Sequence, residues 1–286
     1  MTAFSNVLVG IDFGRQSVNC VAVAAHLAEI SDGRLTIAFV SGGEEEIGSI
    51  EAVQDEFQKF LTLLDEPRVP IKTVIRSGNP AAKLEEIAME IGASVIVVAA
   101  SDKDALERLT IGSTCEALVK RAQVPILVVR EPLQVPFQSI AAAIDYSRIS
   151  IDVLSMSHAL AYDELARLFV LHVNSSEVRD RVVQTAAMHS DGWFDQYERE
   201  TALSEFDRFL AESGVPALIE SGIHLTHRLI GTPWKAVCEH ARQHHVNLIV
   251  MGRYRHGVIR EALIGSNADK VVRHAPCSVL VMHRPA

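Results

Sequence analysis

The chain has 286 residues, of which 48% are apolar and 22% charged, and its formal net charge is −9 at pH 7. This length suggests about two globular domains, each long enough to bury a core of its own. The acidic balance argues against a nucleic-acid partner, because contacts to phosphates need an excess of lysine and arginine on one face of the protein.

Segments for export or membrane insertion are not expected. The opening residues, MTAFSNVLVG, lack the basic start and the apolar core of a signal peptide. Apolar stretches all fall short of the roughly 20 residues of a membrane helix. We therefore expect a cytoplasmic protein without a membrane partner. The four cysteines stand far apart with no CxxC pair, which argues against a disulfide framework and a cysteine zinc site.

Residues 1–131 are predicted to form a first domain, in which apolar runs alternate with amphipathic stretches. Pro80 suits the first turn of a helix, where its missing N–H is not needed. The predicted strands are Val7–Ile11, Leu35–Val40, Ile71–Ile75, Val95–Ala99 and Ile126–Val129. The predicted helices are Ser17–Ile30, Ile50–Leu64, Pro80–Ile91 and Ser113–Ala122.

The segment EPLQVPFQ, with two prolines, is expected to link this domain to a second one over residues 139–286. The second half is longer, mostly because of Asn174–Ser213, which we interpret as an extended connection and a helix. The predicted strands are Ile140–Ile144, Leu168–Val173, Ile223–Leu229, Leu248–Met251 and Ser278–Met282. The predicted helices are Ile151–Tyr162, Phe194–Ser213, Pro233–His244 and Asn267–Arg273.

The two halves repeat one pattern. Each opens with an apolar run that ends in aspartate, NVLVGID from Asn6 and SIAAAID from Ser139. Each closes with IGS, a helix-like stretch and an apolar run, starting at Ile111 and at Ile264. Such self-similarity indicates a duplication. Near-continuous Val, Ile and Leu runs between helices indicate parallel strands buried on both faces, so each half is predicted to be an α/β domain with a doubly wound five-stranded parallel sheet, a Rossmann-like fold.

Ligands of open parallel sheets bind beyond the carboxyl ends of the strands. Three segments of each half should meet there: the aspartate after the first strand, the turn after the second strand, and the loop before the Gly-Ser helix. Asp12 and Asp145 are the two aspartates, and they can contact a ligand, cap the following helix or merely end the strand. Val40 and Val173 stand at the ends of the second strands.

The third segment carries a resemblance to a known family. MGRYRHGVIREALIGSNADKVVRHAPCSVLVM, from Met251, resembles the C-terminal signature of universal stress proteins, whose nucleotide-binding members carry G-x2-G-x9-G-[S/T]. Gly252 occupies the first position, and Gly265 with Ser266 occupies the last. Arg255 replaces the middle glycine, where it can either pair with a phosphate or fill the space. The resemblance spans nearly all of both halves and implies a HUP-type fold.

The first half keeps the spacing of this signature but not its glycines. Ala99 and Asp102 stand at the two early positions, and Gly112 with Ser113 at the last. Asp102 places a negative charge where phosphates would lie. We therefore expect the first half to have a degenerate site, dead for ATP or adapted to another ligand.

The resemblance implies roles for individual residues. Gly265, Ser266 and Asn267 open a helix whose free N–H groups and positive end can hold a phosphate. Gly252 leaves room for backbone beside the ligand. Asp145 is implied near the ribose or a metal, and the Val173 backbone near the adenine. A weaker matching set in the first half consists of Asp12, Val40, Gly112 and Ser113.

This pattern predicts a stress-response protein that binds an adenine nucleotide, ATP with Mg²⁺, as a regulatory module, with the site mainly in the second half and no essential cofactor. The alternatives are a nucleotide-free interaction scaffold, a binder of another small ligand, and a slow ATPase. No GxSxG, HExxH or P-loop motif identifies a catalytic residue.

Assembly and metal binding are predicted separately. The two halves are expected to pair as an internal pseudo-dimer through Ile126–Val129 and Ser278–Met282, and the family's habit of pairing implies a dimer of tandem chains. His240 and His244 share a helix face, but no third and fourth ligand is identifiable, so no metal site is expected.

Overall fold

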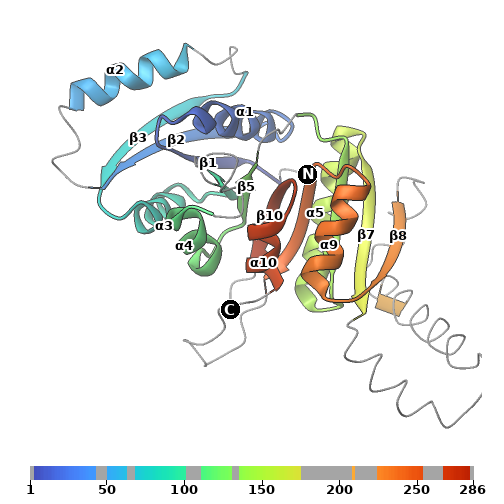
Figure 1. The fold of residues 1–286 in the computed structure, drawn as a ribbon. Helices are drawn as coiled ribbons and strands as arrows, with labels where there is room; N and C mark the ends of the chain where they lie inside the picture. Colours follow the sequence, from blue (N-terminus) through green and yellow to red (C-terminus); the bar gives the residue numbers. More distant parts are fainter. Residues whose placement is uncertain are drawn as a thin grey trace, which may run out of the picture.

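The structure, a computed structural model, describes residues 3–42, 50–62, 68–100, 111–130, 135–174, 208–209, 224–253 and 267–283. These residues form one sheet of 10 strands in the order β3-β2-β1-β4-β5-β10-β9-β6-β7-β8 (Figure 1). Every pairing within a half is parallel, and β5 pairs with β10 in antiparallel fashion. The predicted α/β fold with a parallel sheet in each half is therefore confirmed.

The elements of the first half follow the predicted order with small differences at their ends. Helix α2 ends at Leu61, three residues before its predicted end, and α1 starts at Arg15, two residues before its predicted start. The strands are β1 (Asn6–Ile11), β2 (Arg34–Ser41), β3 (Ile71–Ser77), β4 (Val95–Ala99) and β5 (Ile126–Val129). The helices are α1 (Arg15–Glu29), α2 (Ile50–Leu61), α3 (Pro80–Ile91) and α4 (Ser113–Arg121).

The second half repeats this arrangement. Helix α5 extends beyond its predicted range at both ends: Ile149 and Ser150 are buried in its first turn, and the helix ends at Glu164, before Leu165 in the left-handed conformation. The helix predicted over Phe194–Ser213 lies outside the described residues, apart from Arg208 and Phe209. The strands are β6 (Ser139–Ile144), β7 (Arg167–Asn174), β8 (His224–Ile230), β9 (Leu248–Arg253) and β10 (Ser278–His283). The helices are α5 (Arg148–Glu164), α9 (Pro233–Gln243) and α10 (Asn267–His274).

Both faces of the sheet are covered, as the apolar strand runs predicted. In β1 the consecutive residues Val7, Leu8 and Val9 are all fully buried. Val7 and Val9 belong to a core with α1 and α5, whereas Leu8 belongs to a second core with α3, α4, α9 and α10. Successive side chains of a strand point to opposite faces, so a strand between two cores must be apolar at every position.

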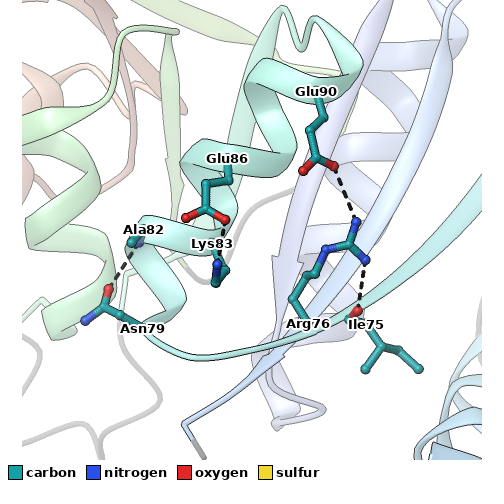
Figure 2. A network of polar contacts seen from close by, with 7 residues as sticks. All are labelled: Ile75, Arg76, Asn79, Ala82, Lys83, Glu86 and Glu90. Atoms are coloured by element: carbon teal, nitrogen blue, oxygen red, sulfur yellow. Dashed lines mark hydrogen bonds and ion pairs between the residues drawn. The ribbon is translucent and has the colours of Figure 1, made fainter.

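Helix α3 illustrates how local chemistry fixes a helix against the sheet (Figure 2). The Asn79 side chain accepts a hydrogen bond of 3.1 Å from the Ala82 N–H, Pro80 begins the helix, and Gly92 ends it in the left-handed conformation. The Arg76 guanidinium lies 3.4 Å from Glu90, which joins the end of β3 to the helix. The start and the stop of the helix are thus set by its own residues, and an exposed ion pair joins its last turn to β3.

The predicted junction between the halves is confirmed by the pairing of β5 with β10, in which Leu127 lies opposite Leu280 and Val128 opposite Val279. Polar contacts flank it. The Arg130 guanidinium donates to the carbonyl oxygens of Val272 and Arg273, at 2.7 and 3.0 Å.

A second contact between the halves joins α1 to α5. His26 Nε2 lies 2.6 Å from Glu164 Oε1, and the Glu164 side chain is only 1% exposed. The other carboxylate oxygen accepts a hydrogen bond from the Phe137 N–H at 3.0 Å. In the first half the Phe4 N–H donates instead to the Ser31 hydroxyl at 3.2 Å. Glu164 thus stands at the position of Ser31, and its longer side chain contacts His26 in the other half.

None of the helices that the structure describes is long and apolar enough to cross a membrane. The four cysteines are buried as free thiols. Burial raises the pKa of both Cys115 and Cys277 to about 12. Cys277 packs in an apolar core, as small apolar side chains do.

Replacing His26 by alanine is expected to lower the free energy of unfolding by about 1–3 kcal/mol, because a buried Glu164 oxygen loses its donor. Urea unfolding monitored by circular dichroism measures this change. Lys59→Ala is the control, because it breaks an exposed ion pair of 3.7 Å with Glu56 and is expected to cost less than about 0.5 kcal/mol. Equal unfolding midpoints for the two variants contradict the prediction.

Candidate functional site

The candidate site lies at the carboxyl ends of the strands in the second half, where Asp145 follows β6. A single carboxylate oxygen, Asp145 Oδ1, accepts three hydrogen bonds: from the Ser147 N–H at 3.1 Å, the Ser147 hydroxyl at 2.5 Å and the Ser150 hydroxyl at 2.9 Å. The Asp145 N–H donates in turn to Ser150 Oγ at 3.1 Å. The carboxylate is thereby held in one orientation, while Oδ2 accepts no hydrogen bond from the residues that the structure describes.

These hydrogen bonds also set the charge of Asp145. Burial of its carboxyl group acts to raise the pKa, but the hydrogen bonds from Ser147 and Ser150 outweigh this effect and hold the pKa below its ordinary value. Asp145 therefore remains a carboxylate throughout the physiological pH range.

The first half contains the same turn. Asp12 Oδ1 accepts hydrogen bonds from the Gly14 N–H at 2.8 Å and the Ser17 hydroxyl at 2.9 Å. Gly14 and Ser147 occupy the N-cap positions of α1 and α5, so the aspartates are not helix caps. Each aspartate instead belongs to a turn, and the residue that follows it has a positive φ: 58° at Phe13 and 61° at Tyr146.

Sequence reasoning missed the two serines, although a signal for them is present. The segments IDFGRQS and IDYSRIS share the pattern D-[FY]-[GS]-R-x-S, which ends at Ser17 and at Ser150. The serine five residues after the aspartate is the donor that orients the carboxylate in both halves.

The strand order places the second-half candidates at one crevice. Strand β6 lies between β9 and β7, and the connections to these two neighbours leave in opposite directions, which makes a topological switch point. Ala143 pairs with Met251, and Ile144 pairs with His172. Asp145, Gly252 and Val173 each follow one of these paired residues, so the structure brings all three to the same edge of the sheet.

Gly252 has a packing role as well. A Cβ atom on this residue would lie 2.5 Å from Cγ2 of Ile149 in α5, closer than side-chain atoms approach. The glycine therefore allows α5 to lie close against β9, directly beside the Asp145 turn.

The remaining second-half candidates are only partly described. Arg255, Gly265 and Ser266 lie outside the described residues. Asn267 is described as the exposed first residue of α10.

In the first half, Gly112 is the N-cap of α4 and Ser113 is its exposed first residue. The Gly112 N–H donates to the Ala100 carbonyl at 2.7 Å, so this amide is already engaged within the protein. Val40 lies at the end of β2, near Asp12 at the end of β1. The four first-half candidates therefore also gather at the carboxyl edge.

The aromatic side chains beside the two aspartates differ between the halves. In the second half Tyr146 stacks on His172 with ring centroids 4.1 Å apart and an interplanar angle of 17°. His172 bonds through Nδ1 to the Ile144 carbonyl at 3.1 Å and through Nε2 to Asn174 Oδ1 at 3.0 Å. This pair combines a flat ring surface with polar groups.

In the first half the corresponding residues are Phe13 and Phe39, with centroids 4.8 Å apart. Helix α2 adds Phe57 and Phe60, which lie 5.0 and 5.9 Å from Phe13 and are buried. The first half thus has a cluster of four phenylalanines where the second half has the Tyr146–His172 pair, on which one phenylalanine, Phe209, packs at 5.3 Å from the Tyr146 ring.

The described residues contain no group of three or more His, Cys, Asp or Glu side chains arranged to hold a metal ion. His240 and His244 stack on each other at 4.2 Å, and both pack against Phe169 at 5.0 Å. This pair belongs to the contact between α9 and β7.

The sequence profile described as "Universal stress protein family" matches the chain twice, over residues 3–130 and 136–283. Universal stress protein YxiE of Bacillus subtilis is 27% identical over 150 residues, which cover 51% of this chain and 99% of YxiE. Universal stress protein MJ0531 of Methanocaldococcus jannaschii is 35% identical over 82 residues, which cover 29% of this chain and about half of that relative, 48%.

Among solved structures, the Pseudomonas aeruginosa protein PA1789 matches with a TM-score of 0.72 and 17% identity, covering 99% of this chain and 94% of its own. A universal stress protein from Archaeoglobus fulgidus matches with a TM-score of 0.67 and 17% identity, covering 99% of this chain and 97% of its own. Both share the fold of this chain along nearly its whole length.

Replacing Ser150 by alanine is expected to raise the pKa of Asp145, because the carboxylate loses one donor. The depressed pKa stabilises the folded state at pH values above the unfolded carboxyl pKa of about 3.9, and this contribution is lost as the pH falls through the folded value. The variant should therefore show a smaller loss of stability on acidification. NMR titration of the Asp145 carboxyl carbon measures the pKa directly.

The control for this experiment is Ser157→Ala. Ser157 lies in the same helix and donates to the Val153 carbonyl at 2.7 Å, away from Asp145. It should leave the Asp145 titration unchanged. A Ser150→Ala variant that titrates like the wild type would show that Ser147 alone sets the charge of this carboxylate.

Replacing Gly252 by alanine is expected to destabilise the fold by about 1–3 kcal/mol, because the added methyl group overlaps Ile149. Gly112→Ala, a glycine change at a different position of the first half, is the control, because a Cβ there would meet the Ala100 carbonyl oxygen at an ordinary 3.6 Å. Thermal unfolding compares the two. Partial recovery in the double variant Gly252→Ala/Ile149→Ala supports the overlap as the cause, whereas equal losses at both glycines refute it.

Proposed function

The chain belongs to the universal stress protein family, and on this premise we propose that its second half binds an adenine nucleotide, ATP with Mg²⁺, as a regulatory module. The observation that carries this proposal is the oriented Asp145 carboxylate at the switch point. Its Oδ1 is bound by Ser147 and Ser150, so Oδ2 is directed by the turn and can accept a hydrogen bond from a ribose hydroxyl or coordinate a cation.

The phosphate part of the proposed site comes from the segment that follows β9. Gly265 and Ser266 immediately precede the first residue of α10, Asn267, and helix N-termini favour anions through their free N–H groups. In the proposed role, the Arg255 guanidinium pairs with the phosphates in place of the family's glycine. Gly252 begins this segment at the same crevice as Asp145.

The base is proposed to lie at the end of β7. The Val173 backbone supplies hydrogen-bonding groups there, and the stacked pair of Tyr146 and His172 supplies an aromatic surface next to them. Aromatic surfaces favour planar bases through stacking.

For the first half we propose the opposite role, a partner without nucleotide. The Gly112 N–H is engaged by Ala100, and Phe13 packs with Phe39, Phe57 and Phe60 where the second half has its polar pair. A nucleotide would have to displace this apolar cluster.

We propose no catalytic role for the described residues beyond at most slow hydrolysis of ATP. A cytoplasmic location of the protein remains a prediction. A dimer of tandem chains remains a prediction too. Size-exclusion chromatography with light scattering checks the assembly.

Calorimetric titration with Mg-ATP tests the nucleotide proposal. The wild type is expected to bind with micromolar affinity, about 8 kcal/mol. Gly265→Asp should abolish the signal by placing a charged side chain at the phosphate position. Asp145→Asn should weaken binding by about tenfold, because it removes the charge while its carbonyl oxygen can still accept the serine hydrogen bonds.

Asp12→Asn is the matched control, because it makes the same change in the same turn of the first half and is expected to leave the affinity unchanged. Equal effects at Asp12 and Asp145 would contradict the assignment to the second half. A wild type without any binding would overturn the nucleotide proposal and favour the scaffold or the binder of another small ligand.

A further inference from the structure

A groove of about 580 Å³ lies in the second half, outside the candidate nucleotide site. It follows α9 from the end of β8 to Arg242, and α10 contributes His274 to its wall. Pockets of this volume accommodate small organic molecules. Helices α9 and α10 both cover the face of the sheet opposite α5 (Figure 1).

The groove has an apolar, aromatic wall. Trp234 is half-buried, and its ring lies 4.8 Å from that of His274. Ile230 also lines the groove and is 58% exposed. Burial raises the pKa of Cys238 in the wall to about 11, so its thiol remains neutral. These side chains favour a ligand with a flat apolar body.

The charged residues of the groove favour a ligand with a negative charge. Lys235 Nζ lies 5.5 Å from the centre of the Trp234 ring, and the Arg242 guanidinium lies 3.3 Å from Glu239. Burial, followed by the charges of neighbouring arginines, lowers the pKa of His274, which keeps its ring neutral at pH 7. Two cations and one carboxylate leave the groove with one net positive charge, in a chain whose net charge is −9.

The first half lacks these side chains. The helices α3 and α9 begin with the matching pairs Asn79-Pro80 and Thr232-Pro233. After these pairs, alanines stand at positions 81 and 82 where the second half has Trp234 and Lys235, and Met89 stands at the position of Arg242. The aromatic and cationic groups are therefore not part of the pattern that the two halves share.

The His274 end of the groove lies away from the proposed phosphate segment, whereas its Gly231 end adjoins β7 through a hydrogen bond of 3.0 Å from the Gly231 N–H to the Asn174 carbonyl. The groove includes His274, the last residue of α10, whereas the phosphate segment precedes Asn267 at the other end of this 8-residue helix. At 1.5 Å per residue the helix is about 12 Å long. Trp234 packs against one core of the sheet and Tyr146 against the other.

We propose that this groove is a second binding site, which takes a small aromatic anion with its ring against Trp234 and its anionic group toward Lys235 and Arg242. An aromatic ring gains from contact with the indole, and an anion gains from the two cations without burying an unpaired charge. The proposed ligand thus has an aromatic ring and an anionic group, and a control compound with the ring but without the charge tests each property.

Calorimetric titration with 2-naphthoate tests this site. The wild type is expected to bind it, and the uncharged 2-naphthalenemethanol should bind at least about tenfold more weakly, because it cannot pair with the cations. The double variant Lys235→Gln/Arg242→Gln should also lose about tenfold in affinity for 2-naphthoate. Lys270→Gln, on the exposed side of α10, controls for the loss of a positive charge and should bind as the wild type does.

Trp234→Phe tests the aromatic wall with little risk to folding, and it should weaken both compounds to a similar degree. In the variant Trp193→Phe, Trp234 is the only tryptophan, and its fluorescence should change on binding. The proposal is overturned if 2-naphthoate does not bind at about 1 mM, if both compounds bind equally, or if the double variant matches Lys270→Gln. Mg-ATP binding by the double variant should equal that of the wild type, which separates this site from the nucleotide site.

Discussion

The antiparallel pairing of β5 with β10 is the interaction on which the rest of this structure depends. All four residues of β5 are buried, and β10 is buried at five of its six positions. Without its partner, each strand would form an apolar sheet edge with unpaired backbone groups, which invites aggregation. The pairing removes this edge from both halves at once and makes them one continuous sheet. The contacts of Arg130 with α10 and of His26 with Glu164 can form only because the pairing fixes the relative position of the halves.

The two halves share one fold, and substitutions at single positions give them different side chains beside the aspartate turn. The Asp-x-x-x-x-Ser turn is the same in both, down to the hydrogen bond between serine and carboxylate. The ring beside this turn is Phe13 in one half and Tyr146 in the other, which separates an apolar cluster from a polar stack. This difference falls at the carboxyl edge of the strands, where a change of ligand requires no change of the core.

Much of the fold could be predicted from the sequence. Strands that are buried on both faces consist of continuous apolar runs such as Val7–Ile11, and helices show a periodic pattern of apolar residues. The start of α5 was less predictable, since Ile149 in its first turn is buried by tertiary packing. The site was predictable only in part. Asp145 and Gly252 follow from their positions at strand ends, but the contact between Gly252 and Ile149 joins residues more than 100 positions apart. The reach of Glu164 to His26 depends in the same way on how the halves meet.

The short connection between β5 and β6 has a consequence for how this protein can work in the cell. Two separate chains that pair through their edge strands dissociate on dilution, so their assembly follows expression level. Here the partners are joined by the residues between Val129 and Ser139, and the pairing becomes intramolecular. The paired state is then equally populated at low and at high copy number. The pairing of the two halves therefore forms within a single chain and does not depend on the concentration of the protein.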